Sequence, residues 1–210
     1  WRDEKEWPLA RTRYRKYFMR GGGSANSVEG DGWLSEKPPK DEPSDRFVYD
    51  PMNPVPTKGG LLCCNHTFNP GGPYDQSEIE SRMDVLVYST PRLERNTEVT
   101  GPVVVKLFAS SMAVDTDFTA KLVDVWPCGA AMLLTDGIVR ARYRETLERP
   151  KLIEPGRVYG YTIDLWSVSN VFKKGHTIRL EVSSSNFPRF DRKMNTGRPV
   201  AEEETPSVAI

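Results

Sequence analysis

The clearest feature of the sequence is an alternation of apolar and polar residues with a period of two. Ile178, Leu180 and Val182 alternate with polar neighbours over residues 177–182, a pattern typical of a β-strand that buries one face and exposes the other to water. Similar runs occupy residues 103–109, 118–125, 138–143 and 158–165. Turn-forming sequences lie between the runs: Pro127-Cys128-Gly129, Asp136-Gly137, Pro155-Gly156 and Lys174-Gly175. Short strands at this spacing predict an all-β sandwich or barrel.

Helices are expected to be few and short. No segment longer than about a dozen residues keeps a helical period without an interrupting Gly or Pro, and the candidates are residues 75–82 and 168–172. The first sixty residues are rich in Gly and Pro, with short regular pieces at 12–19 and 32–35. We expect this leader to form loops and edge strands over a single sandwich domain.

Charge and composition disfavour several classes of partner. Lys plus Arg and Asp plus Glu each number 29, so no net charge attracts nucleic acid or an anionic membrane surface. No window approaches 18 continuous apolar residues and the N-terminus is charged, so neither a membrane span nor a signal peptide is expected. The three cysteines, Cys63, Cys64 and Cys128, do not form the framework of a disulfide-rich secreted domain. They favour a reducing compartment, and we expect a cytoplasmic protein.

The serines at 183–185, with His176 and Asp191, raise the question of a catalytic triad. A serine nucleophile on an α/β-hydrolase sheet needs a G-x-S-x-G elbow, and the chain has none. Successive serines on a strand point to opposite faces, and His176 begins the same strand several residues away. We therefore predict no catalytic residue in this chain.

A metal site is also not expected. Residues 63–66 place a histidine near two cysteines, but adjacent cysteines are too close to share a tetrahedral ion comfortably. Asp115, Asp117 and Asp124 could supply oxygen ligands to calcium. A simpler explanation is that Asp115 caps a turn and Asp117 begins a strand. We expect no metal and no cofactor.

The segment Ser183-Ser184-Ser185-Asn186-Phe187-Pro188-Arg189-Phe190-Asp191 is interpreted as a device that forms a loop. Its hydroxyl and amide groups can bond backbone groups left unpaired where the sheet ends, its aromatic rings can anchor the turn, and Arg189 can pair with Asp191. The residues predicted to act structurally are Asp117, Ser184, Asn186, Phe187, Arg189 and Asp191.

The order of motifs along the chain is more specific than any single motif. The series runs through Gly30-Asp31-Gly32-Trp33-Leu34, Tyr49-Asp50-Pro51, Gly72-Pro73-Tyr74-Asp75-Gln76, Asp115-Thr116-Asp117-Phe118-Thr119, Gly175-His176-Thr177-Ile178-Arg179-Leu180, Ser183-Ser184-Ser185-Asn186-Phe187-Pro188 and Asn195-Thr196-Gly197. This series resembles the C-terminal domain of X-Pro dipeptidyl-peptidases and cocaine-esterase-type serine hydrolases. One departure is Pro127-Cys128-Gly129, where that family usually has Pro-Asp-Gly.

The resemblance implies a jelly-roll β-sandwich of the galactose-binding-like kind. It implies that the catalytic serine, aspartate and histidine lie in a separate, N-terminal α/β-hydrolase domain. Residues 1–20 would then be the tail of that domain and residues 21–210 the C-terminal domain, with the family pattern continuing through further strands. The expected partners are the hydrolase and cap domains of the same protein, and a second copy of the chain through an exposed sheet edge.

Three functional hypotheses follow. The loop 61–74 is the best candidate for a wall of the substrate pocket, through Leu61, Leu62 and Phe68, although it could equally pack on its own sandwich. Alternatively, the domain binds carbohydrate through aromatic faces supplied by its five tryptophans, Trp1, Trp7, Trp33, Trp126 and Trp166. The third hypothesis is a purely structural or oligomerisation domain.

Overall fold

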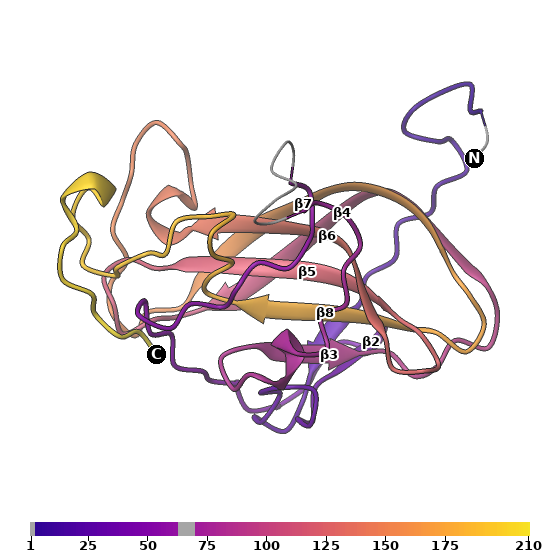
Figure 1. Cartoon of the computed structure of the whole chain (residues 1–210), viewed down its shortest axis with the longest axis horizontal. Helices are drawn as coiled ribbons and strands as arrows, with labels where there is room; N and C mark the ends of the chain where they lie inside the picture. The colour runs from indigo at the N-terminus through magenta and orange to yellow at the C-terminus, as the bar shows by residue number, and fades with distance from the viewer. Residues whose placement is uncertain (1–2, 63–69) are drawn as a thin grey trace.

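The alternating runs form the strands of a β-sandwich. The structure is a computed structural model that describes residues 3–62 and 70–210. One sheet has six strands in the order β1 (Phe18–Arg20), β2 (Trp33–Ser35), β3 (Leu86–Ser89), β8 (Thr177–Ser183), β5 (Asp117–Val125) and β6 (Ala131–Arg140). The other sheet pairs β4 (Thr97–Ala109) with β7 (Tyr159–Phe172). Figure 1 shows the two sheets as facing layers. The expected all-β sandwich is confirmed.

The main hydrophobic core lies between the two sheets. Alternate residues of β5 and β7 face each other across it: Phe118, Ala120 and Leu122 from β5, and Tyr161, Ile163 and Leu165 from β7. The rings of Phe118 and Tyr161 pack with their centroids 4.8 Å apart. Burial of such side chains contributes roughly 1.5–3 kcal/mol each, so this interface accounts for much of the stability of the fold.

The outer face of the large sheet is covered as well. Val55, Ile79 and Val85, from the segments before β3, form a second cluster there with Val87 of β3. Lys121 and Glu181, on the polar side of β5 and β8, are each only 2% exposed. The expectation that this side of the strands faces water is therefore wrong, because a third layer of chain lies over it.

The two sheets approach closely where β6 crosses β7. The hydroxyl of Thr135 donates to the carbonyl of Leu165. A Cβ atom at Gly137 would lie 2.2 Å from the carbonyl oxygen of Asp164. Asp136 and Gly137 were expected in a turn but lie inside β6, where the glycine permits this contact.

Three expected elements differ from the structure. Within 75–82 only Ile79–Ser81 form a 3₁₀ turn (η1), and the expected strand 138–143 ends at Arg140, with Ala141–Tyr143 forming a second 3₁₀ turn (η2). The expected helix 168–172 is the end of β7. A positive φ at Trp166 and a register shift opposite Pro102 change the spacing of inward residues from two to three. This irregularity in a strand resembles a helical period in the sequence.

The C-terminal segment is held against one end of the sandwich. Ala209 pairs with Tyr49 in an isolated bridge, and the fully buried Lys193 contacts both Asp115 and Glu203. A last 3₁₀ turn, η3, spans Val200–Glu202. In Figure 1 this segment and the N-terminal segment lie at opposite ends of the molecule. Within residues 3–62 and 70–210, no helix is long and apolar enough to cross a bilayer.

Candidate functional site

Two segments distant in sequence pair with each other beside β6. Residues 55–57 run parallel to residues 185–189. Val55 donates its N–H to the Ser185 hydroxyl (2.8 Å) and accepts the Phe187 N–H at its carbonyl (2.9 Å). Thr57 donates its N–H to the Phe187 carbonyl (2.6 Å) and accepts the Arg189 N–H at its hydroxyl (3.1 Å). This pairing fixes the loop that follows each segment.

Asp136 of β6 lies at the centre of this arrangement. Its carboxylate is within 2.9 Å of the Arg189 guanidinium, accepts a hydrogen bond from the Asn186 amide at 2.9 Å, and is bonded by the backbone N–H of Leu61. Asp136 is 1% exposed. Burial raises the pKa of the Asp136 carboxyl, and the charge of Arg189 opposes that shift. One buried carboxylate thus joins the 185–191 loop to the start of the 61–71 loop.

Two glycines close the base of the 61–71 loop. Gly60 and Gly72 exchange backbone hydrogen bonds of 2.9 and 3.0 Å. Gly60 has a φ of 92°, and a Cβ there would lie 3.2 Å from both Arg189 and Asp136. Glycine is needed because the backbone is left-handed and the space is already filled by the ion pair. We call this pair the glycine neck.

The surface around the glycine neck is rich in exposed apolar groups. Leu61 is 50% exposed, and Leu62 is half-buried. Tyr74, which follows the neck, and Phe187, in the paired loop, are 39% and 41% exposed. Phe68, the third predicted wall residue, lies outside the described residues. Exposed apolar side chains concentrated in one region are typical of a surface that contacts another molecule or domain.

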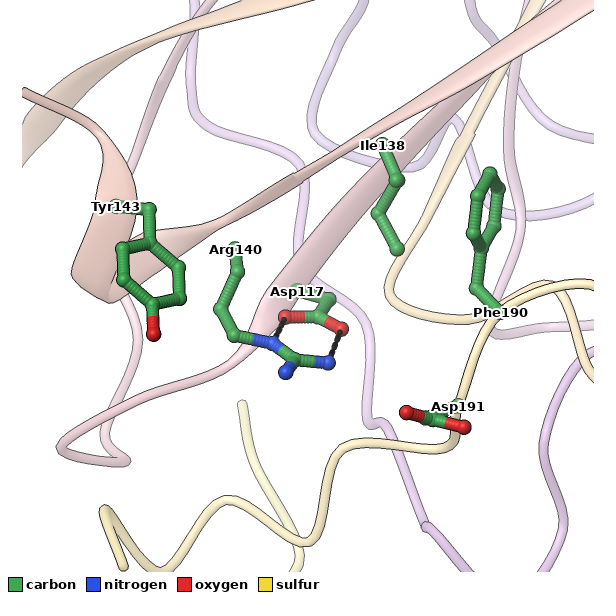
Figure 2. A pocket seen from close by; sticks show the side chains of 6 residues that line it. All are labelled: Asp117, Ile138, Arg140, Tyr143, Phe190 and Asp191. Atoms are coloured by element: carbon green, nitrogen blue, oxygen red, sulfur yellow. Dashed lines mark hydrogen bonds and ion pairs between the residues drawn. The ribbon is translucent and has the colours of Figure 1, made fainter. Parts of the chain in front are cut away.

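A pocket lies on the same face of β5 and β6. It has a volume of about 200 Å³ and is lined by Asp117, Ile138, Arg140, Tyr143, Phe190 and Asp191; we call it the Asp191 pocket. Figure 2 shows its central ion pair, in which Nε and Nη2 of Arg140 donate to the two carboxylate oxygens of Asp117 at 2.8 and 2.9 Å. Burial raises the pKa of the Asp117 carboxyl, while Arg140 opposes the shift. The same bonds raise the pKa of Arg140.

Comparison with known proteins places the chain in a family. Residues 1–209 match the family described as the X-Pro dipeptidyl-peptidase C-terminal non-catalytic domain. The chain belongs to this family. Cocaine esterase of Rhodococcus sp. (strain MB1 Bresler) is 53% identical over 204 residues, which are 97% of this chain and 35% of that protein. The resemblance seen in the motifs is confirmed.

Two solved structures share the fold of the X-Pro dipeptidyl-peptidase C-terminal domain described here. An aminopeptidase from the marine sediment archaeon Thaumarchaeota archaeon gives a TM-score of 0.78 at 32% identity, covering 93% of this chain and 34% of the aminopeptidase. An α-amino acid ester hydrolase gives a TM-score of 0.80 at 26% identity, covering 92% of this chain and 33% of the hydrolase. The chain therefore corresponds to a non-catalytic domain that makes up about a third of its larger relatives.

The serine, histidine and aspartate considered as a triad do not meet in this family domain. His176 pairs through Nδ1 with Asp124 at 2.8 Å, near the C-terminal end of β5. Asp191 lines the pocket beside Asp117, the first residue of β5. Asp117 and Asp124 are about 23 Å apart at the rise of a β-strand. Ser184, 4% exposed, therefore cannot contact both groups.

Two other predictions about the 183–191 loop need correction. Arg189 was expected to pair with Asp191 but forms its ion pair with Asp136. The Phe187 ring was expected to anchor the turn but is exposed, so this residue holds the loop through its backbone. Asp136 was missed because Asp-Gly is usually a turn signal. The signal available in the sequence was a charged residue inside an otherwise apolar strand, which needs a buried partner.

The acidic residues considered for calcium are paired with cations. Asp115 bonds Arg142 at 2.6 Å and lies 3.4 Å from the Lys193 ammonium, while Asp117 is held by Arg140. In the part of the chain that the structure describes, no three His, Cys, Asp or Glu side chains are grouped so as to hold a metal ion. Cys63, Cys64 and His66 lie outside that part.

Proposed function

We propose that this chain is the C-terminal accessory domain of a serine hydrolase that cleaves esters or X-Pro peptides. It packs on the α/β-hydrolase and cap domains of the same protein, and the 61–74 loop forms part of the wall of their substrate pocket. The observation that carries this proposal is the exposed apolar surface around the glycine neck, fixed to the sandwich by buried Asp136. An exposed but firmly anchored apolar loop suits contact with a neighbouring domain.

The wall is tested in the longer polypeptide that carries this chain and its catalytic domain. Leu61→Ala and Leu62→Ala should each lower kcat/KM by about fivefold or more, mainly through KM, because a lost apolar contact to substrate costs roughly 1–3 kcal/mol. Leu147→Ala is the matched control, since Leu147 is 83% exposed on a different loop. Unchanged kinetics in both loop variants would contradict the wall proposal.

Asp136 offers a second arm of the same experiment. Asp136→Asn weakens both the ion pair with Arg189 and the hold of Asp136 on the start of the 61–71 loop, and it should raise KM in the same direction. Asp117→Asn is its control, because Asp117 is also buried and paired with an arginine but bonds neither the loop nor Asn186. Equal KM changes in the two aspartate variants would indicate a general loss of stability instead of a specific effect on the loop.

Exposed tryptophans support a second candidate function, carbohydrate binding. Among the described residues, Trp7, Trp33, Trp126 and Trp166 are between 40% and 65% exposed. Arg20 lies over the Trp33 ring at 5.3 Å, which occupies one aromatic face. Isothermal titration calorimetry of the chain with a panel of sugars separates the two candidate functions. A saturable heat of binding favours a carbohydrate-binding module, and the absence of any heat of binding favours the accessory domain. Pairing of two copies of the chain stays a prediction.

A further inference from the structure

We propose that the Asp191 pocket is a binding site for a guanidinium group. Its volume of about 200 Å³ is below the roughly 300–1,000 Å³ of sites that hold drug-sized ligands. The pocket therefore suits one side chain, or a small molecule of that size. This inference does not depend on the proposed wall of the substrate pocket, because it concerns other residues and is tested on the chain alone.

The charges around the pocket leave one carboxylate without a partner. The short ion pairs there are Asp117 with Arg140, Asp115 with Arg142 and Lys193, and Glu203 with Lys193. Among the described residues, none donates a hydrogen bond to the Asp191 side chain or forms an ion pair with it, and Arg140 is already committed to Asp117 through two bonds. Asp191 is therefore an exposed carboxylate that is free to bond a cation.

Figure 2 shows how Asp191 is placed for this role. Its carboxylate extends from the loop toward the side of the pocket where Arg140 lies, below the rings and the Ile138 side chain that form the upper wall. Asp191 is exposed, and a cation bonded to it would lie beside the half-buried side chains of Ile138 and Phe190. Partial exclusion of water strengthens the attraction between the two charges.

The aromatic walls favour guanidinium over ammonium. The Phe190 ring already carries the Arg189 guanidinium at 5.0 Å from its centroid. Elsewhere in this fold two guanidinium groups lie over the Tyr159 ring, those of Arg144 at 4.4 Å and Arg157 at 5.2 Å from its centroid, so one ring can bind two. A guanidinium is planar, weakly hydrated and able to bond a carboxylate through two N–H groups while it stacks on a ring.

The experiment is an amide NMR titration of the chain with butylguanidinium, using butylurea as an uncharged probe of similar shape. Saturable shifts are expected at residues 138–143 and 190–191 with butylguanidinium and not with butylurea. The affinity should fall at high salt, because the attraction is between charges at a partly exposed site. Shifts that fall elsewhere, or that are equal with the two probes, would overturn the assignment.

Asp191→Asn removes the unpaired charge with little change of shape. It should weaken butylguanidinium binding by about threefold or more, whereas Glu148→Gln, at an exposed glutamate on the 141–155 loop, should leave it unchanged. Equal affinity for all three proteins would refute the site. Since no described residue bonds the Asp191 side chain, its variant is expected to fold normally, and an unchanged melting temperature verifies this.

The guanidinium could be an arginine side chain from another domain or a free small molecule. The same titration on the longer polypeptide separates these sources. If an arginine of a neighbouring domain fills the pocket, butylguanidinium shifts the amides of the isolated chain but not those of the longer polypeptide. If the pocket takes free ligands, both proteins show the shifts.

Discussion

At the scale of single residues, the outer face of the large sheet carries buried charges that make stability depend on pH. Glu80 and Glu181 are 1% and 2% exposed, with Arg179 and Lys121 as their ion-pair partners. Burial, followed by the negative charge of Glu181, raises the pKa of Glu80 from 4.5 to about 8. The folded state therefore holds a proton on this group at pH values where the unfolded chain has released it.

The free energy of unfolding should consequently be largest near pH 4.5 and fall as the pH rises toward 8. The loss from this group is at most about 1.4 kcal/mol per pH unit. Glu80→Gln, which cannot ionise, should flatten the profile measured by urea unfolding, and Glu148→Gln should leave it as in the parent chain. A Glu80→Gln profile as steep as that of the parent would show that another group is responsible. Burial also raises the pKa of Asp117 and Asp136, and both act in the same direction.

The sequence allowed us to predict which polar residues belong to the site, but not which residues they bond. The sequence indicated that Asn186, Arg189 and Asp191 belong to a loop that bonds its surroundings. It did not reveal Asp136 as the common acceptor, because that contact joins residues fifty positions or more apart. Partners at such separation depend on strand register, which no local pattern specifies.

At the scale of elements, strands buried on one or both faces were recognised where their period is regular. β5 and β8 lie at or within a residue or two of the predicted runs. The end of β7 was misread as a helix because of the positive φ at Trp166. The strand predicted at 138–143 continued three residues past the end of β6 and missed the first seven residues of that strand. Irregularities of this kind are set by the partner strand, so they are not visible in the sequence of one strand alone.

The crossing of β6 over β7 gives an element-level prediction. Gly137→Ala should destabilise the fold by about 1–3 kcal/mol, because the added methyl group would press on the Asp164 carbonyl and the two sheets would have to move apart. Gly160→Ala is the matched control in β7, where the nearest atom would be 3.4 Å away on the exposed Phe108 side chain. Calorimetry should show a clearly lower melting temperature for Gly137→Ala only. Equal melting temperatures would mean that the contact is easily relaxed.

At the scale of the whole molecule, the chain lacks an assembled hydrolytic centre among its described residues. His176 and Asp191 are at opposite ends of β5, and the family is described as non-catalytic. We therefore expect the isolated chain to hydrolyse neither p-nitrophenyl acetate nor an X-Pro anilide above background. Robust turnover that survives further purification would contradict the accessory-domain proposal. Architecture and family were both predictable from the sequence, whereas the third layer over the outer face was not, because covering segments lack a periodic pattern.

The glycine neck has a consequence for how such domains diversify. Two backbone hydrogen bonds between Gly60 and Gly72 close the loop at its base. Lengthening a loop that is already closed at its base costs little, since the entropy of closure grows only with the logarithm of length. Under the proposed function, exchanging the stretch between these glycines is therefore a route to changing the substrate preference of the longer polypeptide.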